Sequence, residues 1–506
     1  MADLEETICT YERALTVLDR AFLLSPVAYQ LGQQGRWAGL TARTVEVHHQ
    51  AGRPAQALAI AEGSKSRLLT TLLGRRQIPT PATIPGDLAE REQTLVAALV
   101  DLDAADLARH GSDAAGDSTL PQRQALVAQL VSLWEEMEEG HRPEASDYVA
   151  LRRGDSPAYE DLARLAVDLG PDTAILSIFT TGEHTLLFVL QAGMDVPEAV
   201  DVALPANELR YTYLANYADE VLNRRAHRAA GRPFTHRWRD LGQRLLARVL
   251  PLLEDVTHLV IVPEGPFHLL PIHALYLNPA GETLLDRFTV SYVPALTVLA
   301  RLLQREPILA REAIVLGYTF LGEAQAVAKQ LRVSPLLRKE ADAAHVQAAL
   351  HDRILRLVHL SCHGGFDAND PLRSGVLLAD GLFTARQWME LHFRADLVTL
   401  SACQTGLSGS LGGDEMAGLS QALLYAGASS LLVGLWSVDA RTTAALMVDF
   451  YRRLWDENGD KRTDEATALR EATLALRDGK LLPPMEGMDP SDPYYWAPFI
   501  LVGDWR

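Results

Sequence analysis

The sequence predicts an α/β protein with a mostly parallel sheet flanked by helices, preceded by an all-helical region. Three observations support this prediction. Residues 1–76 carry small and apolar side chains at i, i+3 and i+4 spacing, which is typical of amphipathic helices. From about Pro171 onward, short β-rich runs alternate with helical patterns. Two of these runs end at a reactive side chain, at the position where open parallel sheets bind ligands.

The helical part divides into two pieces. Residues 1–76 form a TPR-like region, because the run at 52–62 resembles the second half of a tetratricopeptide repeat. At most two such repeats fit, and a solenoid usually needs three or more, so we expect this piece to pack on the rest of the chain. Residues 77–150 are predicted to be a proline-rich linker followed by an antiparallel hairpin of helices at about 87–110 and 120–140.

The remaining part carries the predicted strands. Each is a short apolar run bounded by turn residues or by a helical pattern, and the alternation of strands with helices is typical of a parallel sheet. The expected strands are residues 174–180, 185–190, 258–262, 313–316, 355–361, 397–402 and 430–435.

Composition and charge exclude several classes of function. The chain has 506 residues, enough for two or three structural units, and its hydrophobic share of 48% is ordinary for a globular protein. A formal charge of −18 argues against a nucleic-acid surface and against attraction to anionic lipid. The acidic start has no signal-peptide pattern, and no run of about 20 apolar residues occurs. Three cysteines without zinc-ligand spacing suggest a reducing, cytoplasmic setting.

Two strand ends carry the residues best suited to chemistry. The run 355–365 ends in His363 and Gly364, and the run 397–406 contains Cys403. If the two strands are neighbours, His363 and Cys403 emerge side by side at one edge of the sheet. A thiolate is a nucleophile, and a nearby imidazole can take the thiol proton and later protonate a leaving amine. The N–H groups of Gly364 and Cys403 are then suited to an oxyanion hole.

Other residues in these runs are expected to be structural. Cys362 should face the core because side chains alternate along a strand. His359, His268 and His273 are also expected to be structural. The glycine-rich segment 406–413 lacks the Gly-Lys-Ser/Thr ending of a phosphate-binding loop, which argues against nucleotide binding.

The motifs around Cys403 resemble a known family. Residues 401–406 read Ser-Ala-Cys-Gln-Thr-Gly, which departs from the caspase signature Gln-Ala-Cys at its first position and by an extra threonine. This motif and the segments around it look like the CHAT family, caspase-like domains associated with tetratricopeptide repeats, in the clan of caspases and separases. The other segments that carry the resemblance are 262–271, 412–415, 435–439 and 493–505.

The resemblance implies a caspase-like protease domain over residues 151–506, with its catalytic core at about 310–506. It implies peptide-bond hydrolysis, with Cys403 as the nucleophile and His363 as the general base and then acid. It also implies a backbone oxyanion hole at Gly364 and no metal or organic cofactor. The substrate is then a protein.

The resemblance also points to substrate-pocket residues, namely Glu415, Trp436 and Asp439. Each has a structural alternative. Glu415 and Asp439 suit the N-termini of helices that begin near residues 416 and 440, and Trp436 suits the core. Acidic pocket residues favour a basic P1 residue, whereas an apolar P1 is expected if both carboxylates cap helices.

Relatives in this family imply regulation. Separases and the CRISPR-linked and bacterial immune CHAT proteases look like the nearest functional relatives, so a protein regulator acting through the N-terminal helices and a defence or signalling setting are expected. Two other functions stay open: a catalytically silent scaffold that binds proteins through its helical region, and a thiol hydrolase for small amides.

Overall fold

The computed structural model describes most of the chain. The described residues are 2–25, 27–65, 67–74, 80–109, 119–139, 143–215, 220, 223, 236–365, 367, 371–401, 417–436, 439–485 and 488–506. They divide into two compact units, Met1–Leu162 and Ala163–Arg506, which we describe separately.

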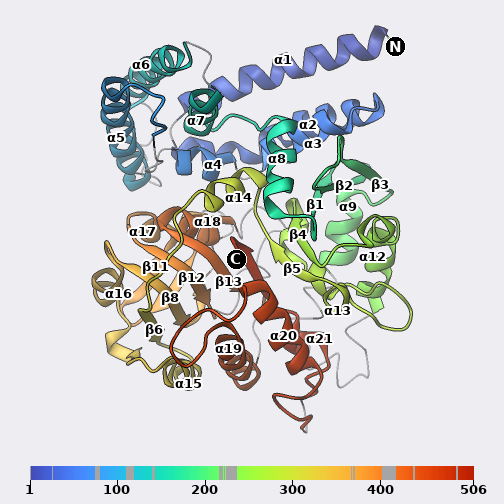
Figure 1. The fold of residues 1–506 in the computed structure, drawn as a ribbon, viewed down its shortest axis with the longest axis vertical. Helices are drawn as coiled ribbons and strands as arrows, with labels where there is room; N and C mark the ends of the chain where they lie inside the picture. The colour runs from blue at the N-terminus through green and yellow to red at the C-terminus, as the bar shows by residue number, and fades with distance from the viewer. Residues whose placement is uncertain are drawn as a thin grey trace. The chain divides into compact units, whose positions relative to one another are not determined.

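The first unit is helical throughout its regular elements (Figure 1). Its helices are α1 (Ala2–Leu24), α2 (Val27–Gln50), α3 (Pro54–Ser64), α4 (Arg67–Gly74), α5 (Gly86–Arg109), α6 (Leu120–Glu138) and α7 (Pro143–Arg153), and α8 (Tyr159–Leu169) crosses into the second unit. Helices α5 and α6 pack on each other, as the predicted hairpin requires, and α7 was not predicted.

A buried carboxylate ties three of these helices together. Glu92 accepts hydrogen bonds from Trp134 Nε1 at 3.2 Å and from the Tyr148 hydroxyl at 2.8 Å, and it pairs with Arg152 at 2.9 Å. A buried charge is tolerated where its lone pairs are satisfied in this way. The amphipathic pattern of the sequence therefore specifies the helices, and this polar centre fixes how they pack.

The second unit is built on one large sheet and a small one. The large sheet has 11 strands in the order β3-β2-β1-β4-β5-β14-β13-β12-β8-β6-β7, and the small sheet has the order β11-β10-β9. Antiparallel pairing occurs at β1–β2, β2–β3 and β13–β14, whereas the other neighbours in the large sheet are parallel. The mostly parallel sheet predicted from the sequence is therefore confirmed.

The strands are β1 (Thr173–Thr180), β2 (Thr185–Gln191), β3 (Glu198–Val202), β4 (His258–Val262), β5 (Thr289–Tyr292), β6 (Ala313–Gly317), β7 (Leu336–Leu337), β8 (Ile354–Ser361), β9 (Gly364–Gly365), β10 (Gly375–Leu378), β11 (Gly381–Thr384), β12 (Arg394–Leu400), β13 (Ala428–Gly434) and β14 (Phe499–Gly503). All seven predicted strands are present. The short strands β3, β5, β7, β9, β10 and β11 were not predicted, because runs of two to five residues carry too little alternation to identify reliably.

Helices cover both faces of the large sheet (Figure 1). The helices are α9 (Ala206–Glu208), α12 (His236–Leu246), α13 (Leu284–Arg287), α14 (Leu296–Leu303), α15 (Leu321–Leu331), α16 (Ala343–Leu350), α17 (Ala385–Met389), α18 (Ala417–Ala426), α19 (Ala440–Leu454), α20 (Glu465–Arg477) and α21 (Pro493–Trp496). Short 3₁₀ and π-helical turns are η1 (Leu209–Leu214), η2 (Leu250–Leu253), η3 (Gly265–Leu269), η4 (Ile272–Ala274), η5 (Arg338–Glu340) and η6 (Pro371–Arg373). Helices α15 and α19 pack together on one face, and α17 and α18 pack together on the other.

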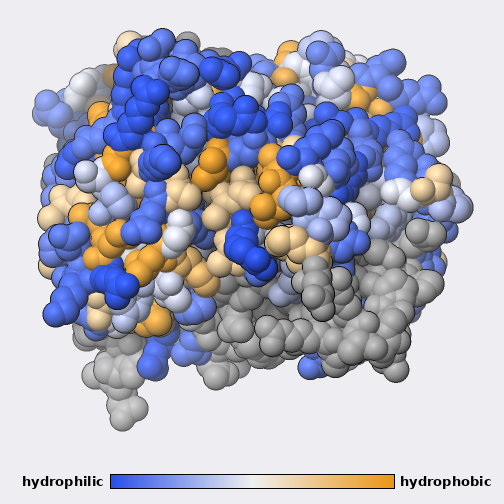
Figure 2. Space-filling view, turned by 90° about the horizontal axis from the view of Figure 1, so that it is seen from below, coloured by the Kyte–Doolittle hydropathy of each residue, from blue (hydrophilic) through white to orange (hydrophobic). Residues whose placement is uncertain are grey.

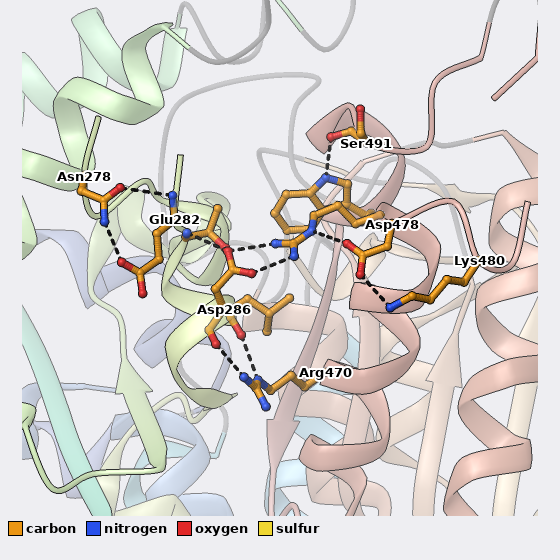
Figure 3. A network of polar contacts seen from close by, with 11 residues as sticks. Asn278, Glu282, Asp286, Arg470, Asp478, Lys480 and Ser491 are labelled. Carbon is orange, nitrogen blue, oxygen red and sulfur yellow. Dashed lines mark hydrogen bonds and ion pairs between the residues drawn. The ribbon is translucent and has the colours of Figure 1, made fainter. Parts of the chain in front are cut away.

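The two halves of the large sheet meet at a weak strand pair that a polar network reinforces. Strands β5 and β14 share a single register pair. Close by, Arg470 of α20 donates to the backbone carbonyls of Leu285 and Asp286 at 2.9 and 2.7 Å (Figure 3). Arg477 pairs with the Asp286 carboxylate at 2.7 Å. These contacts therefore link α13, which directly precedes β5, through α20 to the half of the sheet that carries His363.

On the face drawn in Figure 2, hydrophobic patches are interspersed with hydrophilic residues. Within the described residues, no helix has both the length and the apolar character needed to cross a membrane.

Candidate active site

The candidate site lies where three neighbouring parallel strands end. Strand β12 pairs with β8 on one side and with β13 on the other, and all three point the same way. Their carboxyl ends therefore meet at one edge of the sheet, the edge at which open parallel sheets bind ligands. The sequence analysis required β8 and β12 to be neighbours, and that condition is confirmed.

The register between β8 and β12 is constant. Each β8 residue pairs with the residue 40 positions later in β12, from Ile354 with Arg394 to Leu360 with Leu400. His363 and Cys403 stand three positions beyond the last of these pairs, with the same separation in sequence. Cys403 itself, together with Glu415, lies outside the described residues.

The backbone around His363 is held by neighbouring elements. The carbonyl of His363 accepts a hydrogen bond from the N–H of Leu377 in β10 at 2.8 Å. The imidazole is exposed and makes an edge-to-face contact with Phe320, with ring centroids 4.8 Å apart. Phe320 precedes α15, and its N–H bonds to the carbonyl of Ser361 at 3.4 Å. The imidazole is therefore accessible to substrate while its backbone position is fixed.

Gly364 presents its N–H away from the small sheet. It pairs with Val376 in the antiparallel β9–β10 register. The bond from Leu377 N–H to the His363 carbonyl identifies this as a non-hydrogen-bonded pair, in which the facing residues do not exchange N–H···O bonds. The N–H of Gly364 therefore points to the side opposite β10, as an oxyanion donor at this position requires.

Cys362 and His359 lie on the buried side of the site. Cys362 is fully buried, which confirms the expectation that it belongs to the core. His359 is also fully buried and confirmed as structural, but it occupies the centre of a polar network that the sequence did not predict.

That network joins β8 and β12 to the helices on one face. The Tyr451 hydroxyl of α19 donates to Thr399 at 2.7 Å, so its oxygen accepts from His359 Nδ1, which lies 2.8 Å away. His359 Nε2 lies 2.8 Å from the Ser361 hydroxyl and 3.2 Å from a carboxylate oxygen of Glu323 in α15. Burial raises the pKa of Tyr451 well above its ordinary value, which keeps the phenol protonated as a donor.

The two described pocket candidates both have structural contacts. Trp436 follows β13, is 2% exposed, and donates from Nε1 to the carbonyl of Tyr494 at 2.9 Å. Asp439 is the N-cap of α19 and accepts from the N–H groups of Arg441 at 2.9 Å and Thr442 at 3.4 Å. Both stand on the same sheet edge as His363, and their substrate-binding role stays a prediction.

His273 has a structural position too. It is 4% exposed, and its Nδ1 lies 2.9 Å from the Tyr292 hydroxyl. Burial lowers the pKa of His273 to about 3, so the ring is neutral at physiological pH. Neither its position near Tyr292 nor its protonation state suits it to act with His363.

The sequence missed the partners of His359 for a clear reason. Glu323 and Tyr451 are 36 and 92 positions away from it, so no spacing within a helix or strand connects them. The sequence does contain one signal, since His359 is a polar residue within an otherwise apolar run. A buried polar residue needs hydrogen-bond partners, but the sequence does not identify them.

Comparison with known proteins identifies the second unit. The family model described as CHAT domain matches residues 235–504, more than half of the chain. Tetratricopeptide repeat protein 28 of Mus musculus is 32% identical over 126 residues, which is 25% of this chain and 5% of the mouse protein. The chain therefore covers only a small fraction of that relative's length.

Two solved structures of the Saccharomyces cerevisiae separase–securin complex are also similar. They align with 99% of this chain and with 40% and 48% of theirs, at TM-scores of 0.45 and 0.41 and identities of 10% and 11%. At these TM-scores the likeness is too distant to carry a functional argument. The family model, which matches more than half of the chain, establishes that this chain belongs to the CHAT domain family.

Proposed function

We propose that this protein is a cysteine endopeptidase in which Cys403 is the nucleophile and His363 the general base. The observation that carries the proposal is the register of β8 and β12. Parallel neighbours with a constant offset of 40 residues favour the emergence of His363 and Cys403 at the same level of one sheet edge. The exposed imidazole and the directed Gly364 N–H supply the two other parts that such a site needs.

In the proposed mechanism, His363 takes the thiol proton and the Cys403 sulfur attacks the carbonyl carbon of the scissile peptide. The N–H groups of Gly364 and Cys403 stabilise the oxyanion of the tetrahedral intermediate. The intermediate collapses to a thioester as the C–N bond breaks, and His363 gives its proton to the leaving amine. Water, deprotonated by His363, then hydrolyses the thioester and restores the thiol.

Substrate specificity belongs to the same proposal. Asp439 and Glu415 favour a basic P1 residue, with Trp436 as part of the pocket wall. Asp439 has one carboxylate oxygen in the helix cap, which leaves lone pairs for a second partner. Preference for an acidic P1 residue in a positional peptide library would contradict this specificity.

The test is covalent labelling of the full chain with peptidyl electrophiles that carry different P1 residues. We expect labelling of wild type, no labelling of Cys403→Ala or His363→Ala, and unchanged labelling of Cys9→Ser. Cys9 is the matched control because it is an exposed cysteine that the proposal does not use. Labelling that survives Cys403→Ala would remove Cys403 as the nucleophile.

The same experiment separates the two other functions. A protein-binding scaffold without activity would give no Cys403-dependent labelling with any P1 residue. A small-amide hydrolase would cleave small amides but leave peptides and folded proteins intact. Cleavage of a peptide at an internal bond, lost in Cys403→Ala, distinguishes the endopeptidase from both.

Regulation is the least direct part of the proposal. We include a protein regulator that binds the N-terminal helices, in a defence or signalling setting, by analogy with the family. Removing residues 1–150 should then change peptidase activity or abolish capture of the regulator. Unchanged activity and unchanged partner binding would contradict a regulatory role for these helices.

A further inference from the structure

A cavity lies at the opposite ends of the strands from His363. It has a volume of about 540 Å³ and is bordered by the amino ends of β6 and β8 and by the end of α15. Its lining includes four arginines and one acid: Arg311, Arg332, Arg353, Arg356 and Glu312. The volume lies within the range of small-molecule sites in proteins. In a chain with a formal charge of −18, this concentration of cationic side chains is unusual.

Arg356 is the preorganised member of the set. It is 8% exposed, its guanidinium carbon lies 4.7 Å from the centre of the Trp455 ring, and it reaches the carbonyl of Gly459 at 3.4 Å. Its Nε is buried and has no hydrogen-bond partner among the described residues. Burial and the nearby charge of Arg311 lower the pKa of Arg356, so an anion beside it would relieve an electrostatic cost.

The other three arginines are held by pairs that a ligand can replace. Arg311 pairs with Asp460 at 2.6 Å and Arg332 with Glu457 at 3.7 Å, and all four side chains are more than 60% exposed. Arg353 pairs with Glu312, again near the surface. Exposed ion pairs contribute little to stability and are screened by salt, so these guanidinium groups can exchange their carboxylate partners for a ligand.

We propose that the cavity binds a small anion carrying two or more phosphate groups. Guanidinium groups match phosphate oxygens with two parallel hydrogen bonds, and four of them around one cavity exceed what a single carboxylate needs. Asp460 and Glu457 belong to the turn that follows α19, and they occupy two of the arginines when the ligand is absent. The site is separate from the proposed peptidase site and does not rest on it.

The test is binding of inorganic triphosphate to the full chain, measured by calorimetry at low and moderate salt. We expect one molecule bound per chain, with an affinity that falls as salt rises. The double variant Arg332→Gln/Arg353→Gln should weaken binding about tenfold or more, because it removes two charge-assisted partners. Arg91→Gln is the matched control, since Arg91 is also exposed and paired with a glutamate, and it should bind as wild type.

A second variant is expected to change triphosphate affinity in the opposite direction. Asp460→Asn removes a carboxylate that competes for Arg311, so it should tighten triphosphate binding by roughly threefold. These exposed positions are replaced without disturbing the core, and thermal unfolding confirms that each variant is folded. Equal affinity for triphosphate and for a nucleoside triphosphate assigns recognition to the phosphates, whereas tighter binding of the nucleotide adds contacts from its base or sugar.

Three outcomes would overturn the proposal. The first is the absence of triphosphate binding at low salt. The second is binding that the double arginine variant leaves unchanged. The third is tighter binding of an oligoglutamate peptide than of triphosphate, which would make the cavity a docking site for acidic protein segments.

Discussion

Buried polar groups are stabilised in different ways at the two ends of β8, β12 and β13. Beneath the carboxyl ends, His359 joins Tyr451, Thr399 and Ser361 through hydrogen bonds of 2.7 to 2.8 Å. One acid, Glu323, closes this network. Each of these groups has a partner, so the buried side of the strands that lead to His363 is held by hydrogen bonds.

At the amino ends of β12 and β13 several ionisable groups cluster together. Glu465 is fully buried and lies 3.8 Å from the ammonium group of Lys461. Two carboxylates, those of Asp396 and Asp504, are also close to it. Ser430 has one hydroxyl hydrogen, and its oxygen lies within hydrogen-bond distance of both the carbonyl of Asp396, at 2.9 Å, and Glu465. Burial raises the pKa of Glu465 well above its ordinary value. A protonated Glu465 donating to Ser430, which donates in turn to Asp396, satisfies this geometry.

The difference shows where the molecule tolerates electrostatic cost. Beneath the carboxyl ends the buried polar groups are linked by hydrogen bonds, whereas at the amino ends burial raises the pKa of Glu465 and four arginines line one cavity. Because chemistry at a strand end needs fixed geometry, a stabilising network is expected beneath the proposed active site. The following predictions test this contrast.

The largest expected effect is on activity at the carboxyl edge. His363→Ala should lower kcat/KM for peptide cleavage by roughly 10²–10⁴-fold, since it removes the proposed general base. The urea midpoint should stay unchanged because the imidazole is exposed. His351→Ala, at another exposed histidine, is the control and should leave both measurements as in wild type. A large loss of stability in His363→Ala would make His363 structural instead.

The next effect is on stability at the same edge. His359→Leu leaves the Glu323 carboxylate buried without its partner and should lower the free energy of unfolding by about 3–5 kcal/mol. The double variant His359→Leu/Glu323→Met replaces both partners by apolar groups and should recover much of that loss. Urea unfolding followed by circular dichroism measures both. A single variant that loses under about 1 kcal/mol would show that the network contributes little.

At the amino edge the expected effect depends on pH. Because the folded-state pKa of Glu465 is raised above its unfolded value, the unfolded chain loses this proton first as pH rises, and the wild type is progressively destabilised from about pH 4.5 upward. Glu465→Gln cannot titrate, so its advantage over wild type should grow by about 1–2 kcal/mol between pH 5 and pH 8.

Glu306→Gln is the control for this measurement, since Glu306 is 88% exposed. Its stability difference from wild type should be flat over the same pH range. A Glu465→Gln curve parallel to that of wild type would mean that Glu465 is ionised in the folded protein at all these pH values.

The smallest expected effect separates two roles of Asp439. Asp439→Ala removes the N-cap of α19 and should cost about 1 kcal/mol, whereas Asp439→Asn keeps a capping oxygen and should change stability by only a few tenths. If Asp439 also lines the substrate pocket, Asp439→Asn should reduce the preference for a basic P1 residue. Unchanged P1 preference in a stable Asp439→Asn protein would leave capping as its role.

Short-range patterns in the sequence specified much of this protein. Apolar spacing predicted the N-terminal helices, and bounded apolar runs predicted the strands that carry the parallel sheet. The positions of His363 and Cys403 after two such runs led to a site that required β8 and β12 to be neighbours, as they are, and alternation was enough to place Cys362 in the core. These features depend on spacings of a few residues, which a single sequence records.

Tertiary structure decided which distant groups meet. Several contacts join residues that are far apart in the chain. They are the 40-residue register of β8 and β12, the partners of His359, the hydrogen bonds from Arg470 to the α13 segment, and the arginines that line the cavity. Such contacts depend on how helices cross the sheet and which strands become neighbours, and their free energy is gained only when the whole unit packs. The sequence alone therefore determined the helices, the strands and the reactive residue types. Packing determined the hydrogen-bond network around His359 and the clustering of ionisable groups at the amino ends of the strands.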